Sequence, residues 1–197
     1  STNITTVVVP LLCFDKTGTL TKGKPVISDF VRIKNCSDQG QMLPDEELIW
    51  MLGSLENNSN HPLAAAIVAY AEKNGKAEKS QFATPINFSA TTGKGISGEV
   101  LQRLVGIGNR SFAAMNQISL NPEVESAMAE LEHAGRTAVF ACVDNEIVAV
   151  IGVSDEIRAD SRAAIQYLQQ QGIDVWMVTG DNHRTSSAVA QAFPPQE

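Results

Sequence analysis

The sequence predicts an α/β fold: a Rossmann-like domain with a parallel sheet, interrupted by an inserted α+β domain with an antiparallel sheet. Near each end of the chain an apolar run, 7–14 and 173–178, leads directly into a polar turn, as buried parallel strands do. The middle of the chain instead combines helical periodicity with short β segments that tight turns connect. We therefore expect residues 1–25 and 152–197 to form the outer, partial domain and residues 26–151 to form the inserted domain.

The composition is that of a globular protein, with 43% hydrophobic residues, 19% charged residues and a net charge of -7. The 15 lysines and arginines are scattered, so a nucleic-acid partner is not expected. No apolar run reaches the about 18 residues that suggest a membrane span, and residues 7–14 lack the basic flank of a signal peptide. Cys13, Cys36 and Cys142 form no CxxC pair, so we expect buried, inert thiols in a reducing compartment rather than a zinc site or a disulfide.

The outer segments predict two strands and two helices. Pro10 fits poorly in a central strand, so the first strand either begins after Pro10 or is bent there by an insertion. The second strand, 173–178, is apolar and is expected to be buried on both faces. The helix before it should end at Gly172, and another helix should cover 184–193. The first of these helices is expected to face inward through Ile157, Ala164, Ile165 and Leu168.

The inserted segment predicts a mixture of strands and helices. Strands are expected at 25–34, 96–100, 104–109, 137–143 and 146–153. Helices are expected from Asp45, from a cap at Asn60 and from a cap at Asn121. Two hairpins are expected, one turning near Gln102 and the other at Asp144-Asn145.

Asp15 is the strongest candidate for a catalytic residue. It ends the first apolar strand, and the carboxyl ends of parallel strands form the edge where α/β folds bind ligands. A carboxylate there can attack phosphorus and form an aspartyl-phosphate, provided that cations neutralise the reacting charges. Lys16, the hydroxyls of Thr17 and Thr19, and N–H groups around Gly18 could contribute, together with Mg²⁺. The alternative is a plain Thr/Gly turn with an exposed aspartate.

Residues 15–21, DKTGTLT, resemble the phosphorylation signature of the P-type ATPases along its whole length. The resemblance implies a haloacid-dehalogenase-like outer domain and phosphorylation of Asp15 by ATP in each transport cycle. It also implies that Asp15 and the main-chain carbonyl of Thr17 help to hold Mg²⁺. A soluble phosphatase of the wider haloacid-dehalogenase-like class would use a second aspartate at position 17, and the threonine there suits a phosphoenzyme that hydrolyses slowly.

Two further segments of the outer domain resemble this family. Thr179-Gly180-Asp181 follows the second apolar strand and resembles the second phosphate-site motif, although a plain strand-ending turn is the alternative. The resemblance implies that the Thr179 hydroxyl binds the transferred phosphoryl group and that Asp181 acts near Mg²⁺ and ATP. Asp155 and Arg158 match the acidic and basic residues of the family's hinge, which helps to bring ATP to the phosphorylation site. A helix N-cap is the competing explanation.

The middle of the chain resembles the nucleotide-binding domain of the heavy-metal branch, the copper and zinc pumps. The matching residues are Glu56, His61, Pro62, Gly93, Lys94, Gly95, Ile96, Gly108, Asn109 and Arg110. Glu56 can accept a hydrogen bond from the adenine amino group, and His61 can contact the adenine or the phosphates. The glycines of 93–95 allow close approach because no Cβ intrudes. Ile96 would pack on the base, and Asn109 could bond the ribose or phosphates. Taken singly, each of these residue types is common in turns and helix ends.

Together, these patterns predict the ATP-binding and phosphorylation region of a heavy-metal P-type ATPase, with copper export as the first choice. ATP and Mg²⁺ are the expected cofactors, and the membrane and actuator domains of the same pump are the expected partners. This region would be a cytoplasmic part of an integral membrane protein, and the transported metal would bind elsewhere. The family's later phosphate lysine and GDGxND motif are absent from the sequence, so the chain itself is expected to bind ATP with little turnover. A soluble phosphatase and a non-catalytic nucleotide-binding module are the alternatives.

Overall fold

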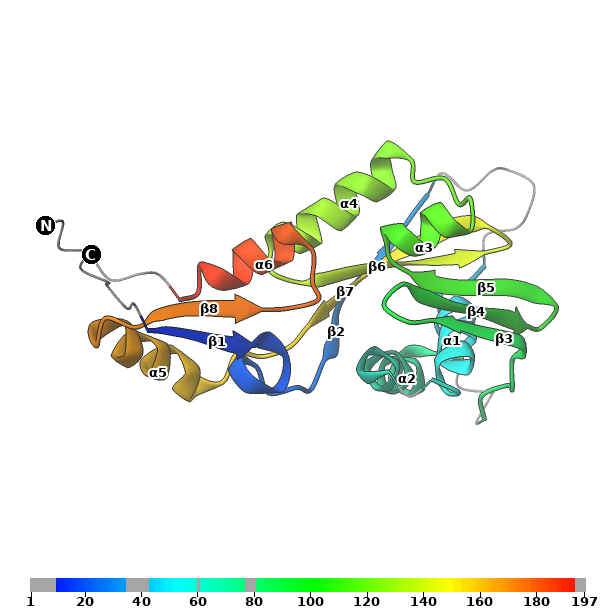
Figure 1. Cartoon of the computed structure of the whole chain (residues 1–197). Coiled ribbons are helices and arrows are strands. Elements are labelled where there is room, and N and C mark those ends of the chain that lie inside the picture. Colours follow the sequence, from blue (N-terminus) through cyan, green and yellow to red (C-terminus); the bar gives the residue numbers. More distant parts are fainter. Residues whose placement is uncertain (1–9, 35–42, 60, 77–80, 194–197) are drawn as a thin grey trace, which may run out of the picture.

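The computed structural model describes residues 10–34, 43–59, 61–76 and 81–193, which form two sheets and their helices (Figure 1). The strands are β1 (Leu11–Asp15), β2 (Val26–Arg32), β3 (Ile86–Thr91), β4 (Gly95–Val100), β5 (Arg103–Gly108), β6 (Thr137–Val143), β7 (Glu146–Ser154) and β8 (Asp174–Val178). The helices are α1 (Asp45–Glu56), α2 (Pro62–Asn74), α3 (Arg110–Met115), α4 (Pro122–His133), α5 (Ala159–Gln170) and α6 (His183–Ala190). A short helical turn, Lys16–Leu20, follows β1.

β1 and β8 form a two-stranded parallel sheet, although they lie far apart in the sequence. Their register pairs Leu11 with Asp174 and Asp15 with Val178. The N–H of Asp174 donates to the carbonyl of Pro10 at 2.9 Å. β1 begins directly after this proline, which was the first of the two alternatives predicted for this strand. Helix α5 packs against β8. The predicted α/β class, with a parallel sheet made from the two ends of the chain, is confirmed.

The exposure of β8 shows that the prediction of burial on both faces is wrong. Trp176 and Val178 are 63% and 57% exposed, whereas Val175 and Met177, on the opposite face, are half-buried. The described part of the chain therefore covers one face of this strand more than the other. In α5 the predicted inward residue Ile165 is buried, but Ala164 is exposed. An apolar run alone does not reveal how many faces of a strand are covered.

The six-stranded sheet is antiparallel, with the order β2-β7-β6-β5-β4-β3. Helices α1 and α2 cover one face, and α3 and α4 cover the other (Figure 1). Alternate residues of β6 serve the two faces. Val139 and Ala141 lie in the core with α1 and α2, whereas Ala138 and Phe140 lie in the core with α3 and α4. Sandwiching between helices explains why β6 is apolar after its first residue, from 138 to 143.

The expected helices and hairpins of the inserted segment are present. α1 begins at Asp45, α4 follows a cap at Asn121, and β6 and β7 pair across Asp144-Asn145. The expected cap at Asn60 lies outside the described residues. The cap of α2 is His61, whose side chain accepts from a backbone N–H of the first turn. None of the described helices combines the length and the apolar character that crossing a bilayer requires.

The cysteines differ from one another. Cys142 is buried, and burial raises the pKa of its thiol to about 11, so this thiol is inert as predicted. Cys13 is exposed, so the prediction of burial is wrong for it. It lies on β1, in the sheet whose surface is only partly covered. Cys36 lies outside the described residues.

Two antiparallel segments connect the sheets. The N–H of Lys22 donates to the carbonyl of Glu156 at 2.9 Å, and the N–H of Arg158 donates to the carbonyl of Leu20 at 3.0 Å. An isolated bridge joins Thr21 and Ile157 between these bonds. The two passages of the chain between the sheets are therefore fixed to each other.

Candidate active site

The carboxyl ends of β1 and β8 bring Asp15 and the Thr179-Gly180-Asp181 turn to one edge of the parallel sheet. Asp15 pairs in register with Val178, the residue before this turn. Lys16, next to Asp15, forms an ion pair with Asp181, and the two side chains are 10% and 11% exposed. Both strands end on the side that faces the six-stranded sheet (Figure 1). The structure thus brings together the candidate residues from the two ends of the chain.

Asp181 is held by side chains from three strands or strand ends. Besides Lys16, the Thr179 hydroxyl donates to its Oδ2 at 3.2 Å and the Thr137 hydroxyl donates to its Oδ1 at 2.8 Å. Thr137 begins β6 of the other sheet and is not among the residues predicted from the sequence. No local motif marks this threonine, because the contact depends on how the two sheets meet. Gly180 is exposed, with open space where a Cβ would lie.

The loop after Asp15 closes around the hydroxyl of Thr21, a residue that is 2% exposed. The N–H of Gly18 donates to this hydroxyl at 3.2 Å, and the hydroxyl donates to Oδ2 of Asp155 at 2.6 Å. Gly18 has a φ of +78°, which favours glycine. Asp155 therefore supports the loop directly and does not cap α5, which begins after Arg158. Arg158, the other hinge candidate, bonds to Asp160 at 3.1 Å.

Glu56 ends α1 with its side chain buried, and the residue is 3% exposed. Burial raises the pKa of Glu56 from 4.5 to about 7, and a hydrogen bond from Ser59 offsets part of that rise. Its Oε2 atom has no hydrogen-bond partner among the described residues. An external donor at this atom would be favourable, because a buried acceptor without a donor is costly. His61 stands exposed at the start of α2, the helix that packs against α1.

The other nucleotide candidates lie in or beside the loop between β3 and β4. The Asn109 amide donates to the Gly93 carbonyl at 2.8 Å, and the Asn109 N–H donates to the Lys94 carbonyl at 2.9 Å. Gly93 has a φ of +71° and open space around its Cβ position, so the backbone conformation favours glycine there. Gly95 pairs with Gly108 across β4 and β5. The structure brings these candidates together at one end of the hairpin.

Internal packing also explains why residues 95 and 108 are glycines. A Cβ on Gly95 would lie 2.3 Å from the Ile107 carbonyl oxygen and 2.8 Å from the Phe112 ring. A Cβ on Gly108 would lie 2.4 Å from the same ring. Phe112 belongs to α3, a helix that the sequence analysis did not predict, capped by Asn109. Ile96 is buried in the core cluster beneath α1 and α2.

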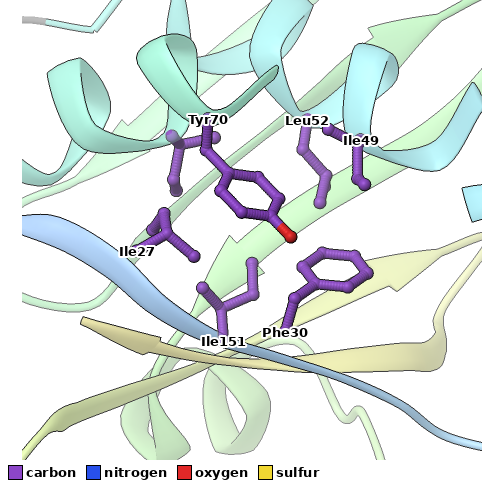
Figure 2. Close-up of a pocket in the computed structure, with 7 residues that line it drawn as sticks. Ile27, Phe30, Ile49, Leu52, Tyr70 and Ile151 are labelled. Atoms are coloured by element: carbon purple, nitrogen blue, oxygen red, sulfur yellow. The ribbon is translucent and has the colours of Figure 1, made fainter. Parts of the chain in front are cut away.

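The two groups of candidates lie in different parts of the molecule, one at the ends of β1 and β8 and the other around α1, α2 and the β3–β5 strands (Figure 1). The apolar pocket in Figure 2 belongs to neither group, since no candidate residue lines it. It lies between α1, α2 and the sheet, and the rings of Phe30 and Tyr70 stack there at 5.9 Å. Its lining is Ile27, Phe30, Ile49, Leu52, Ile67, Tyr70 and Ile151. We interpret it as a gap in the core.

Possible ligands for a metal ion lie at the edge of the parallel sheet where β1 ends. The part of the chain that the structure describes contains no group of three or more His, Cys, Asp and Glu side chains that could hold an ion. At this edge, Asp15 offers a carboxylate and Thr17 offers a main-chain carbonyl. Thr17 lies at a break in the helical turn, where its ψ is 122°. Mg²⁺ prefers such oxygen donors and usually keeps water and phosphate ligands as well. The donors therefore fit Mg²⁺ bound together with a phosphate group.

Comparison with known proteins gives the class. The profile of the haloacid dehalogenase-like hydrolases matches residues 9–195, and the chain belongs to this family. It is 36% identical over 183 residues to the copper-exporting P-type ATPase of Staphylococcus epidermidis. It is 39% identical over 180 residues to the probable copper-importing P-type ATPase A of Enterococcus hirae. These matches cover 93% and 91% of this chain but only 21% and 22% of the relatives' own lengths.

Solved structures agree. A zinc-transporting PIB-type ATPase in the E2·Pi state matches with a TM-score of 0.62 and 29% identity, over 94% of this chain and 28% of that chain. The catalytic CPx-ATPase domain CopB-B matches with a TM-score of 0.62, over 96% of this chain and 59% of that chain. At 20% identity this second match supports the fold alone. The predicted resemblance to heavy-metal P-type ATPases is confirmed, as is the haloacid-dehalogenase-like fold with an antiparallel second sheet.

Proposed function

We propose that this chain is the nucleotide-binding and phosphorylation region of a heavy-metal-transporting P-type ATPase. The observation that supports this most directly is the ion pair of Lys16 with Asp181. It joins the motif at 15–21 to the motif at 179–181, beside Asp15. A soluble phosphatase of the same family would use a second aspartate at the position of Thr17. The threonine therefore favours the pump.

In the proposed reaction, a carboxylate oxygen of Asp15 attacks the γ-phosphorus of ATP. The new O–P bond forms, the bond to the β–γ bridging oxygen breaks, and ADP leaves with that electron pair. Lys16 would balance charge on the phosphoryl oxygens, the Thr179 hydroxyl would contact them, and the bare Gly180 leaves them room. Asp181 would hold Lys16 in position. Water later attacks the phosphorus of the acyl-phosphate, the O–P bond to Asp15 breaks, and inorganic phosphate leaves as the Asp15 carboxylate is restored.

Mg²⁺ would be held by Asp15 and the main-chain carbonyl of Thr17. When bound, it supplies positive charge beside the transferred group, which lowers repulsion between the anionic nucleophile and the triphosphate. The protein's own contribution at this point is to keep both donors at one edge of the parallel sheet. Support for this assignment comes from the type of donor.

ATP would bind through the inserted domain, for which we propose the limits 26–151. Oε2 of Glu56, which has no hydrogen-bond partner within the described ranges, would accept a hydrogen bond from the adenine amino group. His61, exposed at the start of α2, would contact the adenine or the phosphates. The Gly93 loop, which Asn109 shapes, would approach the nucleotide, with Ile96 behind it against the base.

Because the two groups of residues are separated, transfer requires the inserted domain to move toward Asp15. The paired connecting segments, where Asp155 bonds to Thr21, are the proposed hinge. In the whole pump, membrane and actuator domains would be the partners, and this region would lie in the cytoplasm. Copper is the proposed cargo, since both curated relatives named above are described as copper transporters, and export is the proposed direction. The metal would bind outside this chain.

Acid-stable labelling of Asp15 tests the proposal. The whole pump is incubated with Mg²⁺ and ATP labelled at the γ-phosphate, quenched in acid, and treated with hydroxylamine, which cleaves acyl-phosphates. We expect label that Asp15→Asn abolishes and that Asp160→Asn, an exposed aspartate outside the site, leaves unchanged. Titration of ATP into the chain itself should give binding that Glu56→Ala weakens and the exposed control Glu72→Ala does not. Binding without label would indicate a non-catalytic module, and hydrolysis of small phosphoesters without label would indicate a phosphatase.

A further inference from the structure

Glu132 on α4 is a charged residue in an unusual position. It is 0% exposed, and the proposed phosphoryl transfer does not use it. A buried carboxylate persists only when cations and hydrogen-bond donors satisfy it. Its partners therefore show what it does.

Three side chains converge on Glu132, and they come from both parts of the molecule. The Arg110 guanidinium, at the start of α3, contacts both carboxylate oxygens, with Nη2 at 3.3 Å from Oε2. From α6 and its cap, Arg184 Nη1 lies 3.0 Å from Oε2 and Asn182 Nδ2 lies 2.6 Å from Oε1. Arg110 is also paired with Glu125 at 2.9 Å, whereas Glu132 is the acidic partner of Arg184. One carboxylate thus joins the inserted domain to the helix that follows Asp181.

Neighbouring contacts fix the same joint. The Thr185 hydroxyl donates to the Arg136 carbonyl at 2.8 Å, and the Thr137 hydroxyl donates to Asp181. Thr185 is 0% exposed. The end of α4 and the start of β6 therefore hold residues 181, 182, 184 and 185, with Glu132 at the buried centre.

The other end of this chain of contacts is the proposed nucleotide loop. Arg110 directly follows Asn109, whose amide donates to the Gly93 carbonyl. The order Gly93, Asn109–Arg110, Glu132 and Asp181–Asn182 is therefore a continuous set of bonded or adjacent groups. Each step is a hydrogen bond or a neighbour in sequence rather than mere proximity.

We propose that Glu132 is a positioning residue, whose buried carboxylate holds α6, and with it Asp181, in a fixed orientation against the inserted domain. Asp181 is assigned to the phosphate site by the proposed function, and the inference rests on it to that extent. Because Glu132 keeps Arg110 as a partner when α6 moves away, its charge is never left alone. The contacts with Arg184 and Asn182 can therefore open without leaving the Glu132 charge unpaired.

Amide hydrogen exchange and ¹H–¹⁵N spectra of the chain test this inference. Glu132→Gln should speed exchange at Thr185–Ser187 by about ten-fold, since local opening no longer breaks an ion pair, and should shift the Gly180 and Asp181 amide resonances. Exchange in α1 should stay unchanged. Arg184→Gln should do the same from the other side, and it leaves the Arg110–Glu132 pair intact if Glu132→Gln does not fold. The double variant should shift Gly180 no further than either single variant, because both break one contact.

Glu125→Gln is the matched control. Glu125 lies on the same helix as Glu132 and pairs with the same arginine, Arg110, but it does not contact α6. It should leave the exchange of 185–187 and the Gly180 resonance unchanged. Equal effects of Glu125→Gln and Glu132→Gln, no effect of Arg184→Gln, or faster exchange spread evenly over α1 and β6, would each overturn the inference. ATP titration of the same variants distinguishes the two proposals. Failure of the wild-type chain to bind ATP would contradict the nucleotide assignment, whereas the exchange data, collected without ATP, would still decide the role of Glu132.

Discussion

Lys16 and Asp181 form a largely buried ion pair between residues 165 positions apart in the sequence. Asp181 also accepts a hydrogen bond from Thr137 on β6, so this one carboxylate ties both strands of the parallel sheet to the antiparallel sheet. Lysine and aspartate at this position therefore have a structural role beside the proposed catalytic one. Their removal should be visible in the stability of the protein as well as in phosphorylation.

Replacing Lys16 with methionine should lower the free energy of unfolding by about 3 kcal/mol, because the buried Asp181 loses its cation. Urea denaturation measures the change. Lys22→Met is the control, since Lys22 pairs with Glu156 on the surface, with side chains 48% and 72% exposed. This control should cost less than about 1 kcal/mol. Equal losses for the two variants would contradict the structural role of the Lys16 pair.

The raised pKa of Glu56 predicts a loss of stability with rising pH. Folding raises this pKa from 4.5 to about 7, so the protonated form favours the folded state and its contribution disappears as the pH rises through 7. Between about pH 5.5 and about pH 8, the wild type should lose about 2 kcal/mol relative to Glu56→Gln. Urea denaturation at both pH values measures the difference. Glu130→Gln, an exposed glutamate variant, should show no such pH-dependent difference.

The same group should control ATP affinity in the opposite direction. The ionised carboxylate is the better acceptor for an adenine amino group, so ATP should bind more weakly as Glu56 becomes protonated below pH 7. Calorimetric titration across this range, with GTP as the comparison ligand, gives the pH profile. An ATP affinity that follows the same profile in Glu56→Gln would rule out Glu56 as its origin.

Three glycine-to-alanine variants should separate backbone conformation from packing. Gly95→Ala places a Cβ 2.3 Å from a backbone oxygen and should cost more than about 2 kcal/mol of stability. Gly93→Ala meets no atom but has a φ of +71°, and should cost about 1 kcal/mol. Gly180→Ala meets neither obstacle and should stay within about 0.5 kcal/mol of the wild type. Thermal or urea unfolding ranks the three, and a Gly95→Ala variant as stable as Gly180→Ala would contradict the β4–β5 packing.

Thr21→Val tests whether Asp155 supports the loop that follows Asp15. The substitution keeps the shape of the buried residue but removes the hydroxyl that bonds to Asp155 at 2.6 Å, so stability should fall by about 1–2 kcal/mol. Thr19→Val, at an exposed threonine of the same loop, is the control and should change little. Equal stability of the two variants in urea would remove Asp155 from the support of the loop.

Much of the fold and of the candidate site could be predicted from the sequence because the signals are local. The strand before Asp15, the turn after Val178 and the hairpin at Asp144-Asn145 each depend on a few consecutive residues, and the structure has all three. Helix α3 escaped notice because its six residues are too few to show a helical period. Trp176 was expected to be buried because an apolar strand gives no sign of which faces are covered.

The sequence by itself determined the α/β class, the resemblance to heavy-metal P-type ATPases and the candidates Asp15 and Glu56, because motifs and periodicity are properties of neighbouring residues. Only the tertiary structure decided that Lys16 meets Asp181, that Thr137 from β6 and Glu132 from α4 reach the segment after β8, and that Phe112 accounts for Gly95 and Gly108. These contacts join residues far apart in the chain. Their energies depend on burial and on the meeting of two sheets, which no local pattern encodes.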